Sequence, residues 1–483
     1  MPPPATRPPG PPQPRTLPQP ARARVPTVPG SSFSSVDLPL ELEAASRPAG
    51  LPDKIGKYRV LNKIGDGATS EVFLCRDDFQ GRTVAIKRVK PSLTNDLPHG
   101  AHSFAAEAAL VGRLQHPNVV KLFDAVDDPV APYLVMEYVA GSTLRPHCRS
   151  DQLLPLEQII ELAFKCAMAL SYVYRQGLIH RDVKPANLLT VMNNGVITDL
   201  KISDFGSVLN LASDVTQVHR VGSLAYMSPE QLDGGTLDCR ADMYSLGAVM
   251  YHLIAGRPPF DAQVQSAMMH QIFNLQPTPL TALRSNLTPE VDAFVQRALS
   301  KKPDDRHGNW EHFAQGLSQL VSKQQVPRGP MQGMLDSERF NLLRKLDFFS
   351  NFGDVELWEV VHRAKWQHFN LGHALYRKGE EGRTFHIIAQ GDVEVFRDGK
   401  KVAQLGTGTS VGEMAYLAPN PELRRHSTDV LTTNNVTTIS FTPETLAQVN
   451  PTCRHLFDEA FIRVLVRRLH AAHEALAHPR RIL

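Results

Sequence analysis

Two short polar segments near the middle of the chain carry the side chains best suited to chemistry. The first reads HRDVKPAN and begins at His180, and the second reads DFG and begins at Asp204. Asp182 can accept a hydroxyl proton, and Lys184 can neutralise a phosphate group. Asn187 and Asp204 offer the hard oxygen ligands that Mg²⁺ prefers. The set therefore suits the transfer of a phosphoryl group held by Mg²⁺.

The neighbouring sequence predicts the elements that must position these side chains. An apolar helical pattern runs from Ile159 to Val173 and leads into the first segment. Short strand-like pieces follow at 188–191 and 200–202. The polar residues are therefore expected on loops beside strands.

A glycine-containing turn lies upstream, between two strand-like runs. The runs begin at Tyr58 and Val72, and the turn carries Gly65 and Gly67. Because glycine has no Cβ, backbone N–H groups in such a turn can approach phosphate oxygens closely. A third strand-like run, TVAIK, ends at Lys87. This order differs from the strand–turn–helix of dinucleotide binders.

Together these motifs resemble those of the Ser/Thr protein kinase family, over about residues 58–322. The spacing of HRDxKxxN and DFG carries most of the resemblance, and Ser70 stands where the family loop has its third glycine. The resemblance implies a bilobal fold that binds ATP and Mg²⁺ and transfers the γ-phosphoryl group to protein hydroxyls. It implies catalytic roles for Asp182, Lys184 and Asn187, and metal-binding roles for Asn187 and Asp204.

The same resemblance implies a set of nucleotide-contacting positions. Lys87 is expected to contact the α- and β-phosphates and to pair with Glu107, on a helix predicted over 104–114. The backbone of Glu137 and Val139 is expected to bind the adenine. With Asp204, the positions are Ile64, Gly65, Gly67, Val72, Ala85, Lys87, Glu107, Met136, Glu137 and Val139. Met136 can also be interpreted as a core residue, and the two roles overlap.

The polar stretch after the DFG motif matches the activation segment of the family. Ser213, Thr216 and Ser223 are candidate phosphate acceptors there, and each can also be interpreted as an ordinary solvated hydroxyl. Arg181 could hold a phosphate through two hydrogen bonds and so order the segment.

Two further family positions predict structural contacts. Glu230, in the run MSPE, is expected to pair with a buried arginine that is best matched by Arg306. Asp242 is expected to hold the backbone of the catalytic loop.

A second region follows a linker predicted at 323–335. From His373 onward, short alternating strands are separated by glycines, which predicts a small β-roll. A nearly continuous helix is predicted from about His455 to the C-terminus. Within the roll, the runs VGEMAYL from Val411 and RRHST from Arg424 stand out.

These runs resemble the phosphate-binding cassette of cyclic nucleotide-binding domains, and residues 340–475 match the overall plan of such domains. The resemblance implies cAMP or cGMP as a regulatory ligand. Glu413 would accept the ribose 2′-hydroxyl proton, and Arg425 and backbone N–H groups near Ala415 would bind the cyclic phosphate. The implied positions are Gly412, Glu413, Arg425 and Ser427, with Thr428 as an alternative to Ser427.

Three alternatives stay open in this region. The cassette is longer than in many members of the family, so Arg424 is an alternative to Arg425. A roll that has lost its ligand and serves as an interaction module would show the same pattern. The run RRHS can also be interpreted as a kinase substrate motif.

Bulk properties set the context. With 483 residues the chain is expected to form two or three domains, and a net charge of +3 suggests neither nucleic acid nor an acidic membrane as a partner. The five cysteines are scattered without a C-x-x-C pair, which favours a reducing cytoplasm. The sequence shows no apolar run long enough to span a bilayer and no secretory h-region.

The sequence therefore predicts an α+β multidomain protein. The expected order is a disordered Pro-rich tail at 1–52, a bilobal protein kinase fold at 53–322, the linker, and at 336–483 a jelly-roll-like cyclic nucleotide-binding domain with flanking helices. Expected partners are protein substrates, ATP, a cyclic nucleotide and a second copy for trans-autophosphorylation. The rival hypotheses are a pseudokinase scaffold and a nucleotide-triggered adaptor that acts through the Pro-rich tail.

Overall fold

The structure is a computed structural model of the whole chain. It describes residues 50–67, 70–90, 111–128, 131–193, 195–205, 209–210, 224–327 and 333–477, all of which belong to one compact unit. Residues 1–49 of the predicted tail lie outside the described residues.

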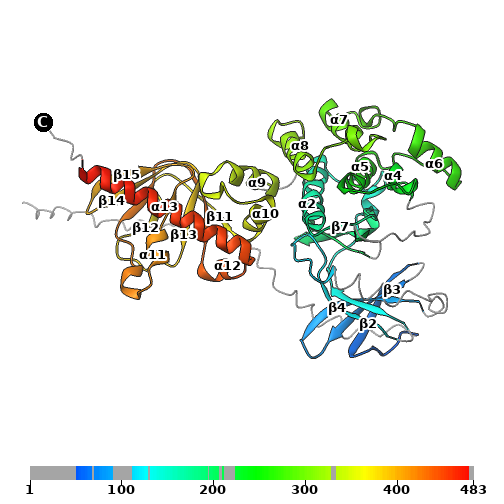
Figure 1. Cartoon of the computed structure of the whole chain (residues 1–483), viewed down its shortest axis with the longest axis horizontal. Helices are drawn as coiled ribbons and strands as arrows, with labels where there is room; N and C mark the ends of the chain where they lie inside the picture. The colour runs from blue at the N-terminus through cyan, green and yellow to red at the C-terminus, as the bar shows by residue number, and fades with distance from the viewer. Residues whose placement is uncertain are drawn as a thin grey trace, which may run out of the picture. The chain divides into compact units, whose positions relative to one another are not determined.

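The first described region is an antiparallel sheet with the strand order β1-β2-β3-β4-β6-β5 (Figure 1). Its inner face buries alternating apolar residues such as Val60, Phe73 and Ile86, as expected for half-buried strands. The strands are β1 (Lys54–Ile55), β2 (Tyr58–Asp66), β3 (Ser70–Asp77), β4 (Arg82–Val89), β5 (Leu122–Val126) and β6 (Tyr133–Glu137).

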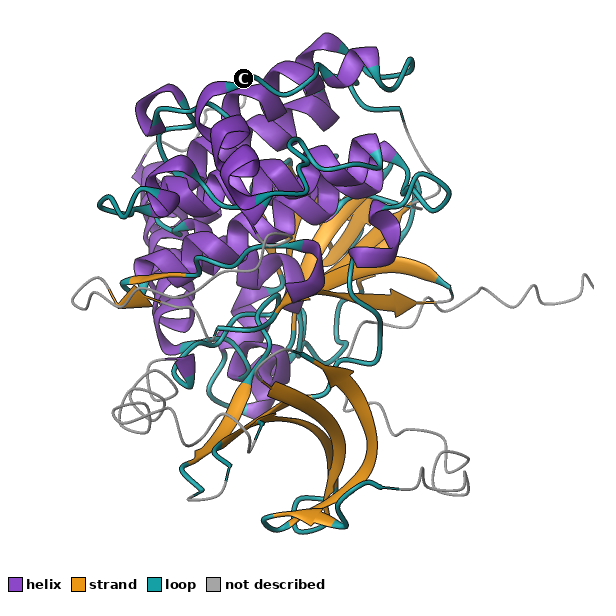
Figure 2. Ribbon diagram, turned by 90° about the vertical axis from the view of Figure 1, so that its right-hand side faces the viewer, coloured by secondary structure: helices purple, strands orange, loops and turns teal. Residues whose placement is uncertain are grey.

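A helical region follows the sheet, as Figure 2 shows. Its central helix α2 (Leu156–Arg175) is buried along almost its whole length, which explains its strongly apolar sequence. The other helices are α4 (Pro229–Leu232), α5 (Cys239–Ala255), α6 (Gln265–Asn274), α7 (Pro289–Ala298) and α8 (Trp310–Ser322). Helix α5 begins where Asp238 accepts a hydrogen bond from Arg240 N and ends at Gly256, which is left-handed at φ 71°.

Two strand pairs lie between α2 and α4. Strand β8 (Leu188–Asn193) pairs with β9 (Val196–Ile202), and β7 (Leu178–Ile179) pairs with β10 (Leu209–Asn210). The short η4 helix (Pro185–Asn187) leads into β8. These strands carry the loops on which the predicted catalytic residues lie.

The last region combines helices with two antiparallel four-stranded sheets, in the orders β11-β18-β13-β16 and β12-β17-β14-β15. The expected β-roll is therefore present. Its strands are β11 (Lys365–Phe369), β12 (Ala374–Tyr376), β13 (Phe385–Gln390), β14 (Val393–Arg397), β15 (Lys400–Leu405), β16 (Ser410–Val411), β17 (Asp429–Thr432) and β18 (Val436–Phe441). Its helices are α9 (Asp336–Lys345), α10 (Asp354–Arg363), α11 (Glu413–Leu417), α12 (Pro443–Ala447) and α13 (Pro451–Ala477).

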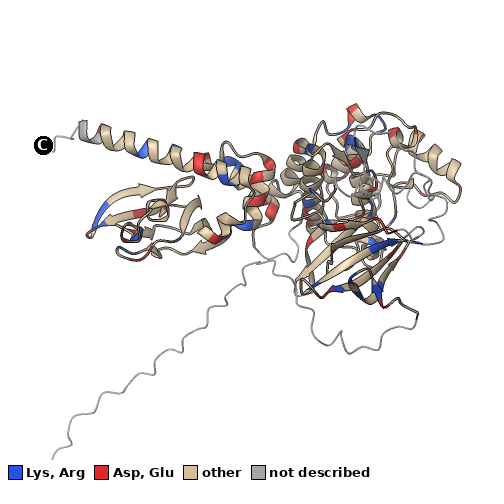
Figure 3. Cartoon of the chain, turned by 60° about the horizontal axis from the view of Figure 1, so that its bottom comes forward, with Lys and Arg blue, Asp and Glu red and all other residues tan. Residues whose placement is uncertain are grey.

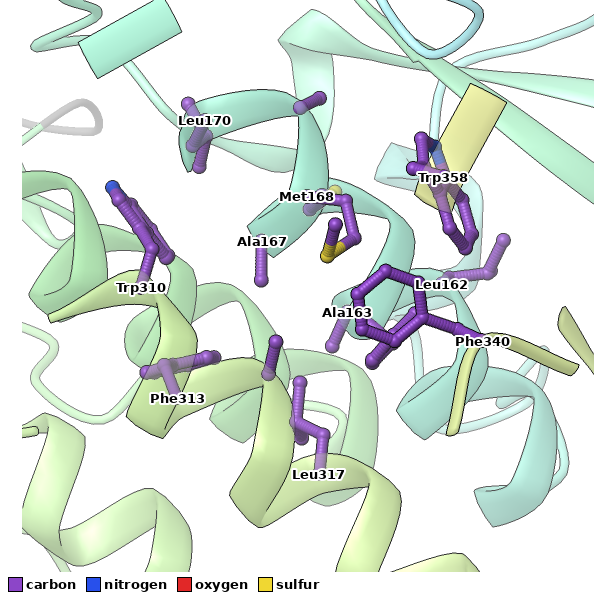
Figure 4. Close-up of a cluster of buried hydrophobic side chains, with 14 of the residues drawn as sticks. Leu162, Ala163, Ala167, Met168, Leu170, Trp310, Phe313, Leu317, Phe340 and Trp358 are labelled. Carbon is purple, nitrogen blue, oxygen red and sulfur yellow. The ribbon is translucent and has the colours of Figure 1, made fainter. Parts of the chain in front are cut away.

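One hydrophobic cluster continues from α2 and α8 into α9 and α10. Figure 4 shows Phe340 beside Leu162 and Ala163 of α2, and Trp358 next to Leu162. The apolar core therefore runs across the predicted linker.

Lys and Arg residues are interspersed with Asp and Glu residues along the described elements (Figure 3). Among the described residues, none of the helices is both long enough and apolar enough to cross a membrane.

Candidate functional site

One buried carboxylate binds the backbone of the loop that begins at His180. Asp242, on α5, accepts hydrogen bonds from His180 N at 2.8 Å and Arg181 N at 2.9 Å. Burial raises the pKa of Asp242, although His180 and these two amides oppose the shift. The predicted role of Asp242 as the holder of this loop is confirmed. Arg181 takes a left-handed backbone with φ 65°, which a non-glycine residue adopts only when its surroundings enforce it.

The three predicted catalytic residues lie together. Lys184 Nζ donates to Asp182 Oδ2 at 2.7 Å, and Asn187 Nδ2 donates to the same oxygen at 2.9 Å. Asn187 Nδ2 also donates to the Asp182 carbonyl at 2.8 Å, which fixes the amide. Its Oδ1 therefore remains for a metal ion. Two donors thus orient the Asp182 carboxylate, the group expected to receive a proton.

Strand pairing places Asp204 next to this group. Leu188 lies opposite Ile202 in the β8–β9 ladder, and Ser203 donates to the Asn187 carbonyl through N at 2.9 Å and Oγ at 3.0 Å. Asp204 follows with φ 64°, again a left-handed backbone for a non-glycine residue.

Lys87 reaches this position from the first sheet, where its Nζ forms an ion pair with Asp204 Oδ1. Burial disfavours the ionised form of Asp204, but the ammonium of Lys87 outweighs burial and lowers the pKa of that carboxyl group. Asp204 therefore stays ionised and can bind a cation. The predicted partner of Lys87, Glu107, lies outside the described residues, as do Gly206, Ser213, Thr216 and Ser223.

The predicted nucleotide positions line up across strands β3, β4 and β6. Val72 lies opposite Lys87, and Ala85 lies opposite Met136. Ile64 is half-exposed at the end of β2, and Gly67 N donates to Ser70 O at 2.8 Å to close the glycine turn. These residues come from one sheet and precede the segment that follows Glu137.

The segment after β6 leaves specific backbone groups for a base. The N–H of Glu137 donates to the Lys121 carbonyl at 2.8 Å. Since that donor is used, the group of Glu137 expected to meet an adenine is its carbonyl. Met136 is partly buried against the large hydrophobic cluster, so its core role is confirmed.

The predicted pairing of Glu230 with Arg306 is confirmed. The two side chains form a two-point pair, with Nη1 to Oε1 at 2.6 Å and Nη2 to Oε2 at 2.8 Å. Arg306 is fully buried and also donates to the carbonyls of Ser300, Lys301 and Arg240. A planar guanidinium with this many acceptors holds the α4 segment firmly against the helical region.

The oxygen donors of the cleft fit magnesium. Asn187 and Asp204 supply an amide and a carboxylate, and Mg²⁺ commonly takes one or two protein oxygens together with phosphate and water. Within the described ranges there is no cluster of three or more His, Cys, Asp or Glu side chains of the kind that holds a metal by protein ligands alone. Phosphate oxygens would therefore have to complete the coordination.

The cassette of the β-roll begins at a constrained glycine. Gly412 precedes α11 with φ 83°, and a Cβ at this position would lie 2.4 Å from Tyr376 Oη. Both the backbone and the space therefore require glycine. The first turn of α11 leaves N–H groups without helical acceptors, as the prediction of an anion-binding backbone near Ala415 requires.

Glu413 is the most deeply buried of the predicted cassette residues, with a side chain 1% exposed. It forms an ion pair with Arg468 of α13, which also donates to the Ser410 carbonyl at 2.7 Å. Burial raises the pKa of Glu413, although Arg468 opposes the shift. Its second oxygen, Oε2, is buried without a hydrogen-bond partner among the described residues, so it could accept a hydroxyl proton.

The other cassette residues are less buried than Glu413. Arg425 is exposed and donates to the Gly379 carbonyl at 2.7 Å, and Ser427 is also exposed. Arg424 donates to the Ala418 carbonyl at 3.1 Å.

A cavity of about 440 Å³ lies in the roll, and Tyr376, which contacts Gly412, is one of its lining residues. Gly412, Glu413, Arg425 and Ser427 do not line it. Its lining residues are Lys365, Gln367, Phe369, Leu375, Tyr376, Thr384, His386, Ser440, Thr442 and Thr445. The cavity is therefore lined by residues other than the predicted ligand contacts.

Comparison with known proteins agrees with both regions. The protein kinase domain family matches residues 58–319, more than half of the chain, and the chain therefore belongs to the protein kinase family. The cyclic nucleotide-binding domain family matches residues 366–449. The predicted fold class, a bilobal kinase fold followed by a β-roll, is thus confirmed.

Named relatives are similar over the first of these regions. The serine/threonine-protein kinase PknB of Mycolicibacterium smegmatis is 37% identical over 295 residues, which cover 59% of this chain and 46% of that protein. The probable serine/threonine-protein kinase SCO3848 of Streptomyces coelicolor is 35% identical over 279 residues, with coverages of 56% and 41%. The chain therefore spans less than half the length of these relatives.

A solved structure is also similar. The kinase domain of Mycobacterium tuberculosis PknI is 28% identical, and the match covers 56% of this chain and 99% of that one, with a TM-score of 0.45.

Sequence reasoning missed Arg468. It lies on the long C-terminal helix, 55 residues after its partner Glu413, and no local spacing connects the two. Its position next to Arg467 in an apolar stretch is a weak signal at most.

Proposed function

We propose that this protein is a Ser/Thr protein kinase that transfers the γ-phosphoryl group of Mg²⁺-bound ATP to protein hydroxyls. The observation that carries the proposal is the continuous set of contacts from Lys87 through Asp204 to the catalytic loop. An ammonium, a carboxylate suited to a metal ion and an oriented proton acceptor then lie in one connected group of contacts. These are the parts that phosphoryl transfer requires.

Each residue in this proposal has a separate task. Asp182 accepts the proton of the substrate hydroxyl through the carboxylate that Lys184 and Asn187 orient. Lys184 can extend from Asp182 toward the γ-phosphoryl group and neutralise its charge. Lys87 binds the α- and β-phosphates. Asn187 and Asp204 would hold Mg²⁺, which would supply positive charge to neutralise the phosphates.

The test is a radiolabelled ATP assay on a generic basic protein, with an Asp182→Ala chain as the comparison. Transfer by the wild type and its loss in Asp182→Ala support the proposal. If the two chains behave alike, the pseudokinase scaffold becomes the better description.

We further propose that a cyclic nucleotide, cAMP or cGMP, binds the β-roll and changes kinase activity. Glu413 supports this proposal, because a buried carboxylate with an unpartnered oxygen suits a ribose hydroxyl. Since Arg425 is exposed and already donates to the Gly379 carbonyl, its guanidinium would have to turn toward a bound cyclic phosphate. A ligand can shift kinase activity only by binding two states with different affinity.

Calorimetry with cAMP and with cGMP tests this second proposal. Binding of either one, followed by a change in the radiolabel assay, supports it. If neither nucleotide binds, the roll is an interaction module.

The proposed organisation follows the predicted ranges: a tail at 1–52, a kinase domain at 53–322, a linker at 323–335 and the nucleotide-binding domain at 336–483. The five cysteines are all free and buried, which supports a reducing, cytoplasmic location. Mixed surface charge supports protein rather than nucleic acid as the partner (Figure 3). A second copy of the chain would serve trans-autophosphorylation at Ser213, Thr216 or Ser223.

A further inference from the structure

Helix α10 places a buried tryptophan against the kinase core. Trp358 is fully buried, and its Nε1 donates to Asn118 Oδ1 at 3.0 Å. Its ring meets Phe164 of α2 edge-on at 5.5 Å between centroids, and Figure 4 shows it next to Leu162. An indole N–H can only donate, so this acceptor fixes the orientation of the ring.

Asn118 connects that tryptophan to strand β9. Its Nδ2 donates to Asp199 Oδ1 at 2.6 Å and to the Leu200 carbonyl at 2.9 Å. Its own carbonyl accepts from Ile202 N at 2.8 Å. The side-chain oxygen of Asn118 thus accepts from Trp358. The side-chain nitrogen and the backbone carbonyl of Asn118 bind β9. Asn118 is fully buried, so an amide that lost the indole donor would have no solvent to replace it.

Strand β9 leads directly into the metal-binding residues. Ile202 ends the strand opposite Leu188, and Ser203 bonds the carbonyl of Asn187. Asp204 follows in a left-handed backbone conformation, which persists only where the surroundings enforce it. The indole of Trp358 is therefore connected to Asp204 through the side chain of Asn118 and the end of strand β9.

A buried charge cluster fixes α9 to α2 and to the same strand, β9. Lys165 of α2 is 3% exposed and binds Asp336 at 2.8 Å and Asp199 at 3.4 Å. Ser337 donates to Glu161 through Oγ at 2.6 Å. Charged groups that are buried together tolerate little displacement, because each would lose its compensating partner.

We propose that Trp358 is a positioning residue for the metal-binding carboxylate Asp204, acting through Asn118 and β9. Its effect on catalysis rests on the proposed kinase function, but its effect on β9 does not. Residues that orient metal ligands from behind typically change metal affinity or activity 10- to 100-fold when altered. Trp358 acts through Asn118 and is thus one contact further from the metal ligand, so we expect a change in metal affinity or activity of about 10-fold.

The chain offers a matched control in Trp366. This indole also packs against the large hydrophobic cluster, but its Nε1 has no hydrogen-bond partner among the described residues. Trp358→Phe and Trp366→Phe therefore remove the same atoms, and only the first removes a donor to Asn118. Replacing Trp358 with 3-benzothienylalanine keeps the ring shape and exchanges the N–H for sulfur, which covers the case in which Trp358→Phe fails to fold.

The first measurement is hydrogen–deuterium exchange of the full-length chain over 197–205. Exchange in this segment is expected to rise several-fold in Trp358→Phe and in the benzothienyl variant, and to stay at the wild-type level in Trp366→Phe. Equal exchange in all chains would overturn the proposal. This readout requires no enzymatic activity, so it separates failure of this proposal from failure of the kinase proposal.

The second measurement is the Mg²⁺ dependence of phosphoryl transfer. The Mg²⁺ concentration for half-maximal rate is expected to rise about 10-fold in the Trp358 variants, with an unchanged KM for the protein substrate. A merely structural defect would lower the active fraction and leave both constants as they are. That result, or an equal shift in Trp366→Phe, would contradict a positioning role.

Discussion

Two regions of this chain are proposed to bind phosphate groups. They differ in how far the residues proposed to bind the ligand already contact one another. In the cleft, Asp182, Lys184 and Asn187 already contact one another, and Lys87 reaches Asp204 from another sheet. In the cassette, Glu413 is bound by the protein's own Arg468, and Arg425 and Ser427 remain exposed. The catalytic-loop residues are thus in mutual contact, whereas two of the proposed cassette contacts face solvent.

The difference has a physical cause. Asp182, Lys184 and Asn187 are neighbours in sequence, and the β8–β9 ladder and the buried Asp242 hold their loop beside Asp204, so they need no ligand to converge. The cassette depends on a short helix and a loop, and its one buried carboxylate would lack a counter-charge without Arg468. A preorganised site suits repeated catalysis, and a site that must rearrange suits a ligand-dependent change of state.

The largest expected effect lies in the assembled site. Asp182→Asn keeps the shape and one acceptor oxygen but removes the group that takes the proton. We expect the rate of phosphoryl transfer to fall by about 10³-fold, since a positioned general base contributes about 10²- to 10⁴-fold. Calorimetry should show unchanged ATP binding. A variant that retains more than a tenth of the rate would show that Asp182 is not the proton acceptor.

A smaller effect is expected from the cassette arginines, which form a matched pair. Arg425→Gln should weaken cyclic nucleotide binding about 100-fold, because it removes the cation proposed for the phosphate. Arg424→Gln should change the affinity by less than about threefold, since that side chain bonds the Ala418 carbonyl within the cassette. Titration calorimetry of the two variants decides between them, and the reverse ranking would assign the phosphate to Arg424.

Two neighbouring arginines on α13 test whether the ion pair between Arg468 and Glu413 stabilises the cassette. Arg468→Gln should destabilise the roll by about 2 kcal/mol, because it leaves Glu413 buried without its cation. Arg467→Gln should cost at most about 1 kcal/mol, since its pair with Asp347 is solvent-exposed. Hydrogen exchange of the β16 and α11 amides measures both. Equal losses would mean that the Glu413–Arg468 pair has no special role.

Sequence predicted the cleft far better than the cassette. Asp182, Lys184 and Asn187 lie within one short motif, so local spacing already determines that they meet. The contacts of Arg468 with Glu413 and of Trp358 with Asn118 join residues 55 and 240 positions apart, and only tertiary packing brings them together. Strongly periodic elements were also predicted well: the pattern over Ile159–Val173 became α2, Leu156–Arg175.

The smallest expected effect concerns pH and the roll alone. His386 is buried against Thr438, with Nδ1 and Oγ1 2.9 Å apart, and Lys365 and His426 are the charged groups that face it. Burial, helped by these two groups, lowers the pKa of His386 to about 4. An unfolded histidine with a pKa near 6.5 binds a proton first as the pH falls, so the native roll loses stability between about pH 6.5 and 4.

About 1 kcal/mol of that stability should be lost by pH 5.5, because one pKa unit corresponds to about 1.4 kcal/mol. Hydrogen exchange of the β13 and β18 amides at pH 7 and 5.5, corrected for the intrinsic rate, measures the loss. His386→Gln cannot take up the proton and should flatten the pH dependence, although it lowers stability at pH 7. Asp204 itself stays ionised throughout this range through its contact with Lys87. Burial also lowers the pKa of His362 beside Asp199 of β9, so acid should loosen that strand as well. The His386→Gln comparison isolates the share of the roll, and a pH dependence of β13 and β18 that this variant leaves unchanged would contradict the assignment to His386.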